Sequence, residues 1–195
     1  MVCCSPGMRA LRTHTRSELR HLTPSERRRV NHWLDRLPYY RSRLRIVVGN
    51  GLDRRGMHAA SFLPQRHIVL DEDLVTKHRE LARILYHEIF HFVWARLGNP
   101  LRQSYEDLLV REWSEGARGE LGWSAEQRKV ALAGDEVRRR SRQWSDYVCE
   151  SFCDSAAWFC LERRREHLEW TLKPRFRQRR RRWFLASDVL PRLQL

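Results

Sequence analysis

Hydrophobic residues recur along this chain mainly at helical spacing, and a short region of strand-like runs lies between the first helical segments. The segment Thr23-Pro24-Ser25-Glu26 combines a capping box with a proline in the first turn, which is typical of a helix start. Apolar residues then follow at positions i, i+3, i+4 and i+7, namely Val30, Trp33, Leu34 and Leu37. The pattern predicts a short amphipathic helix that ends near Pro38.

Three segments after this helix favour β-structure. Residues Leu44 to Val48 form a β-branched run that is closed by Gly49-Asn50-Gly51, which indicates a strand and a turn. Met57 to Phe62 and His67 to Leu70 are the other two candidates, and Pro64 between them fits a loop or an edge position.

The rest of the chain is predominantly helical in pattern. One helix is predicted from the apolar stripe formed by Leu81, Ile84, Leu85, Ile89, Phe92 and Val93. Gly98-Asn99-Pro100 is a helix stop, and residues 101–122 are predicted as another helix with a glycine-broken loop. From Asp135 we expect one long helix that runs to about Trp170 and is ended by Pro174.

These elements predict an α+β fold in a single domain, with a small mixed or antiparallel sheet packed on the long helices. We expect a flexible basic arm at 1–20, the domain at 21–173 and an arginine-rich C-terminal tail at 174–195. Helical content should exceed the average for globular proteins.

The composition indicates which kinds of partner the protein favours and in which cellular compartment we expect it. The formal net charge of +14 in 195 residues favours anionic partners without identifying one. No apolar run is long enough to cross a bilayer, and Met1 to Arg20 lacks the apolar core of a secretory signal, so we expect a cytoplasmic protein. Five cysteines in such a chain argue against a disulfide framework.

The most specific chemical signal is His87-Glu88-Ile89-Phe90-His91, an H-E-x-x-H motif inside a predicted helix. Residues four apart project from one face of a helix, so both imidazoles can bind one metal ion. Glu88 is then placed to act as a general base. The apolar neighbours of the motif leave little wet face, which argues against two solvated histidines.

A catalytic zinc ion needs a third protein ligand and an open position. Glu150 is the leading candidate, because it lies in an almost wholly apolar segment where a carboxylate needs a cationic partner. Asp154, one turn later, can accept the free ring N–H of a ligand histidine. The alternatives for the third ligand are His167, Glu112, Glu115, Cys149 and Cys153. Both cysteines also fit packing as small hydrophobes.

H-E-x-x-H followed by E-x-x-x-D on a second helix resembles the gluzincin metallopeptidases. The resemblance implies a zincin-like domain with one catalytic Zn²⁺ bound by His87, His91 and Glu150, with Glu88 as general base and Asp154 orienting a ligand histidine. It also implies a zinc-dependent endopeptidase whose substrate is a peptide or protein. In that family an edge strand lines the cleft, a role for His58 to Phe62 or a neighbouring strand.

The chain departs from the family pattern in three ways. Cys149 stands where thermolysin-like members have Asn, the gap between His91 and Glu150 is longer, and no separate C-terminal domain supplies the oxyanion donor. Tyr147, Tyr105 or His167 are candidates for that donor.

Two other functions stay open. The arginine block around Phe176 and Trp183 could bind nucleic acid through phosphate contacts and base stacking. Its candidate residues are Arg175, Arg177, Arg179, Arg180, Arg181 and Arg182. This possibility can be joined to the peptidase, since SprT-like proteases also carry H-E-x-x-H and act on DNA-bound proteins. SprT-like proteases take their third metal ligand from a histidine close downstream of the motif, whereas in this sequence no histidine lies between His91 and His167. The third possibility is a catalytically weak zincin-fold module with a regulatory or binding role.

Overall fold

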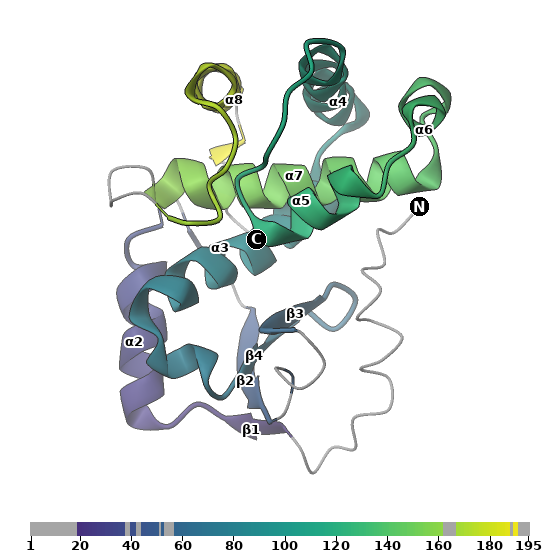
Figure 1. Ribbon diagram of the computed structural model, residues 1–195. Helices are drawn as coiled ribbons and strands as arrows, with labels where there is room; N and C mark the ends of the chain where they lie inside the picture. Colours follow the sequence, from purple (N-terminus) through teal and green to yellow (C-terminus); the bar gives the residue numbers. More distant parts are fainter. Residues whose placement is uncertain are drawn as a thin grey trace.

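The computed structural model describes residues 19–37, 40–41, 44–50, 52, 57–161, 167–187 and 189–190, and these residues form a mixture of helices and strands (Figure 1). The strands are β1 (Leu19–His21), β2 (Arg45–Gly49), β3 (Ala59–Phe62) and β4 (His67–Asp71). The helices are α2 (Pro24–Leu34), α3 (His78–Arg96), α4 (Asn99–Ser114), α5 (Trp123–Val130), α6 (Gly134–Arg139), α7 (Arg142–Leu161) and α8 (Pro174–Ala186). The prediction of an α+β fold is confirmed.

The sheet is mixed and small, with the strand order β1-β2-β4-β3. β2 and β4 are parallel, whereas β1 and β3 pair antiparallel to their neighbours. Alternate side chains point to opposite faces, so Val48, Ile68 and Leu70 join the main core while Val47 and Val69 form a second cluster with Leu52. β3 is an edge strand of this sheet and also contacts α3.

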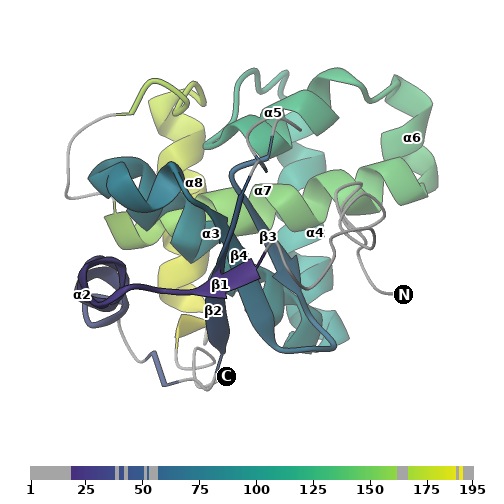
Figure 2. The same cartoon turned by 90° about the horizontal axis from the view of Figure 1, so that it is seen from below.

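Helices α3 and α7 form the centre of the molecule. Figure 1 shows α3 between the sheet and α7, with α4 and α8 on the far side of α7. Figure 2, seen from below, shows the strands in front of α3 and α7, with α4 and α8 crossing behind. This arrangement buries the inner faces of both central helices. Among the residues that the structure describes, no helix combines the length and apolarity that a membrane span needs.

The prediction of one continuous helix from Asp135 to Trp170 is wrong in its continuity and at its C-terminal end, whereas its start lies within one residue of the start of α6. The segment is divided into α6 and α7, because Arg140 adopts a left-handed conformation with φ of 50° and Ser141 caps the first turn of α7. Leu161 is the last described residue of α7, and Trp170 lies in the non-helical stretch 167–173. The prediction for 101–122 holds as α4 followed by an irregular segment, while α5 was not predicted.

Both predicted termini also need correction. Residues 19 and 20, assigned to the flexible arm, belong to β1 and pair with β2; residues 1–18 of the arm lie outside the described residues. The arginine-rich segment is not a tail, because Pro174–Ala186 form α8, which packs through Phe176 and Phe184 onto the main core. Pro174 begins this helix.

A buried ionic network explains why α8 docks behind α7. The guanidinium of Arg180 is fully buried and binds Glu112 of α4 at 2.8 Å and Glu120 at 2.6 Å. Glu120 also accepts hydrogen bonds from Lys129 of α5 and from the Tyr147 hydroxyl of α7. Burial alone would raise the pKa of Glu120, but Arg180 and Lys129 outweigh it and hold that pKa at about 2. The network therefore joins four elements through charges that compensate one another.

Candidate metal centre

The two imidazoles of the H-E-x-x-H motif converge on one point. His87 and His91 lie one turn apart on α3, and their Nε2 atoms are 3.1 Å from each other. Two nitrogens on one tetrahedral zinc ion lie roughly 3.3 Å apart, given Zn–N bonds of about 2.0–2.1 Å. The spacing of the pair therefore suits joint coordination of a metal.

Glu150 of α7 completes a group of three residues that could hold a metal ion, which we call the ligand set. Its Oε2 lies 3.2 Å from His87 Nε2 and 3.8 Å from His91 Nε2, and all three residues are buried. Burial would raise the pKa of Glu150, but the two imidazoles and Arg128 outweigh it and lower that pKa. The other oxygen, Oε1, binds Arg128 of α5 at 3.1 Å. One carboxylate oxygen is thus directed at the imidazoles and the other is held by a guanidinium.

Asp154 connects His87 to the start of α5. Its Oδ1 lies 2.7 Å from His87 Nδ1, and its Oδ2 accepts the backbone N–H of Ala125 at 3.0 Å. A ligand histidine is commonly oriented by a carboxylate on its second nitrogen. Burial opposes a charged His87, but Asp154 and Glu150 outweigh it and raise its pKa well above the usual value. Two imidazole nitrogens and one oriented carboxylate are a donor set that a divalent metal such as zinc prefers.

Gly122 allows this close approach of α5 to Asp154. A Cβ atom added at Gly122 would lie 2.2 Å from the Asp154 carboxyl carbon, so Gly122→Ala must displace that carboxylate. Loss of such an orienting contact typically lowers metal affinity by about 10–100-fold. We expect this loss in a zinc competition titration. Gly134→Ala is the matched control, because its added Cβ meets nothing within 4 Å. Equal affinity in the two variants would contradict the role given to Asp154.

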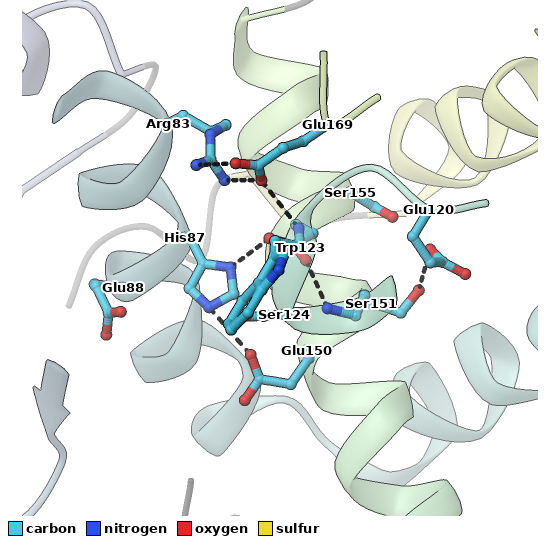
Figure 3. A network of polar contacts seen from close by, with 12 residues as sticks. Arg83, His87, Glu88, Glu120, Trp123, Ser124, Glu150, Ser151, Ser155 and Glu169 are labelled. Carbon is cyan, nitrogen blue, oxygen red and sulfur yellow. Dashed lines mark hydrogen bonds and ion pairs between the residues drawn. The ribbon is translucent and has the colours of Figure 1, made fainter. Parts of the chain in front are cut away.

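Glu88 lies apart from the ligand set and faces the sheet. Its Oε2 accepts a hydrogen bond from the Ser61 hydroxyl of β3 at 2.6 Å, and Ser61 is also 2.9 Å from the Glu88 carbonyl. In Figure 3 Glu88 lies apart from Glu150, and no dashed line joins it to His87 or Glu150. The general-base candidate therefore stands between α3 and the edge strand β3.

Two buried cysteines lie on the other side of His91. Cys149 Sγ is 3.6 Å from His91 Nδ1, and Cys153 is one turn further along α7. Burial raises the pKa of Cys153 to about 12, so this residue is a neutral thiol at physiological pH. Burial opposes the charged form of His91, but Glu150 and Cys149 outweigh it and raise the pKa of His91 to about 9.

The structure places the remaining candidates away from the ligand set. His167 pairs with Glu80 at 2.5 Å, Glu115 pairs with Arg179, and Glu112 belongs to the Arg180 network. The Tyr147 hydroxyl donates to Glu120, and the Tyr105 hydroxyl donates to Ser155. Both hydroxyls serve the network behind α7 and are not free to act as oxyanion donors at the ligand set.

The arginines proposed to contact nucleic acid do not form one exposed stripe. Arg180 was a wrong assignment, because its guanidinium is fully buried between two carboxylates. Arg179 pairs with Glu115, and Arg177 donates to the backbone carbonyls of Trp170 and Leu172. Arg175 and Arg182 are exposed, and Arg181 is half-buried.

Two contacts at this site had no signal in the sequence. The ion pair between Arg128 and Glu150 depends on α5, whose short pattern does not predict a helix. The hydrogen bond from Ser61 to Glu88 depends on the position of β3 beside α3. Gly122 is the one local feature that could have indicated the start of α5, since glycine is among the residues found at the N-cap of a helix.

Comparisons with protein-family models, with curated proteins and with solved structures found no match to this chain.

Proposed function

We propose that this protein is a zinc-dependent peptidase. The observation that supports this most is the convergence of His87 Nε2, His91 Nε2 and Glu150 Oε2 within 4.8 Å of one another. This set comes from two helices that are far apart in sequence, and three protein ligands are the number that a catalytic zinc site uses. The orientation of His87 by Asp154 and the edge position of β3 agree with the same proposal.

In the proposed reaction His87, His91 and Glu150 would hold the ion, which supplies Lewis acidity toward water and the scissile carbonyl when bound. Glu88 accepts a proton at its carboxylate from the attacking water and passes it to the leaving amine. Ser61 steadies that carboxylate from the edge strand. Asp154 keeps the proton of His87 on Nδ1, so that Nε2 is free to bind the metal.

Removal of the third ligand tests the proposal. Glu150→Ala leaves only two protein ligands, so we expect the variant to lose zinc on dialysis and to lose peptide hydrolysis with it. Metal content and cleavage of casein or a peptide library are the measurements. Asp146→Ala is the control, because it removes a carboxylate from the same helix one turn earlier. A Glu150→Ala protein that keeps its zinc would place the third ligand elsewhere.

A further inference from the structure

The ligand set described above uses only one of the two ring nitrogens of His91. Its Nε2 faces His87 and Glu150, while its Nδ1 faces Cys149 at 3.6 Å. The ligand atoms of His91, Cys149 and Cys153 lie within 4.8 Å of one another, and all three residues are buried. Two groups able to bind a metal therefore share one imidazole.

The donor set of the second group differs in kind from the first. Thiolates are soft ligands that select thiophilic ions, whereas the carboxylate of Glu150 is a hard ligand. A nitrogen and a sulfur on one tetrahedral zinc-like ion lie roughly 3.5 Å apart, given bonds of about 2.0 and 2.3 Å, close to the His91–Cys149 separation. Cys149 and Cys153 are one turn apart, which directs both sulfurs to the same face of α7.

Charge also favours a divalent ion at this position. One divalent ion, two thiolates and a neutral imidazole carry no net charge, and a dry protein interior disfavours any net charge. Binding releases the two thiol protons as the two metal–sulfur bonds form, and the Nδ1 proton of His91 leaves to solvent as the metal–nitrogen bond forms.

We propose that His91, Cys149 and Cys153 form a second site for a thiophilic divalent ion and that this site competes with the His87–His91–Glu150 set. A neutral imidazole has one N–H and one lone pair, so His91 serves one metal at a time. When Nε2 binds zinc, Nδ1–H donates to Cys149; when Nδ1 binds the thiophilic ion, Nε2 carries the proton and leaves the first set with two ligands. The site itself does not depend on the proposed peptidase function, whereas the competition does.

Cadmium is the probe, because thiolate ligation gives a near-ultraviolet charge-transfer band that carboxylate and imidazole ligation do not give. All proteins carry Cys3→Ser and Cys4→Ser, so that the band reports on the cysteines of α7. We expect one thiolate-bound Cd²⁺ per chain in this background and in Glu150→Gln. Cys149→Ser and Cys153→Ser should each lose at least half of the band, and the double variant should lose all of it. Cys160→Ser is the matched control on the same helix.

Zinc displacement gives the second readout. Zinc is bound first and one equivalent of Cd²⁺ is then added. Zinc should leave the Cys160→Ser control much more readily than the Cys149→Ser, Cys153→Ser double variant. Zinc release from the double variant measures direct exchange of Cd²⁺ for zinc at the His87–His91–Glu150 set. Absence of the band, or a band that survives in the folded double variant, would overturn the site. A normal band with equal zinc release in both proteins would overturn the competition. A chain that shows the band and binds no zinc would refute the peptidase proposal alone.

Discussion

Replacing Glu88 by Gln is expected to lower peptide hydrolysis by about 10²–10⁴-fold while zinc content stays at the wild-type level. Gln has the same size as Glu and can still accept the Ser61 hydrogen bond, but it cannot take a proton from water. Glu88 does not belong to the ligand set of His87, His91 and Glu150, so its replacement should leave zinc binding intact. The turnover number and the metal content of the same purified sample are the measurements.

The control for this experiment is Glu72→Gln, a change of the same chemistry at an exposed position after β4. It should leave both turnover and zinc unchanged. A Glu88→Gln protein that hydrolyses peptide as fast as the wild type would show that another group handles the proton. A variant that loses zinc as well as turnover would move Glu88 into the ligand set.

Arg180→Leu is expected to destabilise the fold by about 3–5 kcal/mol, because it leaves the carboxylates of Glu112 and Glu120 without their main buried counter-charge. Glu112 Oε1 already has no hydrogen-bond partner, so the pair has little means of compensation. Urea unfolding followed by circular dichroism measures the loss. Arg182→Leu, two residues later and exposed, should change stability by less than about 0.5 kcal/mol. Equal midpoints for the two variants would contradict the role given to the network.

The low pKa of Glu120 gives this network a defined pH dependence. Its folded-state pKa of about 2 lies below the ordinary value of 4.5, so the charged form stabilises the fold at any pH above the ordinary value. That stability is lost as the pH falls from about 4.5 towards 2. In Arg180→Leu this acid-dependent part should shrink, because the carboxylate no longer has the partner that lowers its pKa.

The parts of the fold that could be predicted from the sequence are those with local signals. The capping box at Thr23 forms as expected, with Glu26 bonded back to the Thr23 N–H. The three predicted strands are present within a residue or two. Two of them, β2 and β4, carry β-branched runs, and Gly49 and Pro64 mark where strands end. A carboxylate in an apolar helix needs a cationic partner, which predicts a role for Glu150 beside the histidines, and its carboxylate lies next to both imidazoles.

Non-local interactions account for what was missed. α8 carries many arginines and a low share of apolar residues, so its docking depends on Glu112 and Glu120, which lie about 60 residues or more earlier in the chain. The break before α7 depends on one left-handed residue, Arg140, which has no β-branched or glycine signal. α5 has only eight residues and begins at a glycine without a capping side chain. Its first turn is completed by Glu169 and Asp154 from later segments.

This borrowed start of α5 has a consequence for how the molecule gains and loses order. The Trp123 N–H is satisfied by Glu169, which also binds Arg83 of α3, and the Ala125 N–H is satisfied by the carboxylate that orients His87. If α5 lifts away, the carboxylates of Glu169 and Asp154 each lose a backbone N–H donor, so the partners of Arg83 and His87 are held less firmly. We therefore expect metal affinity at the proposed site to fall when the short helix α5 unfolds locally, before the rest of the molecule unfolds.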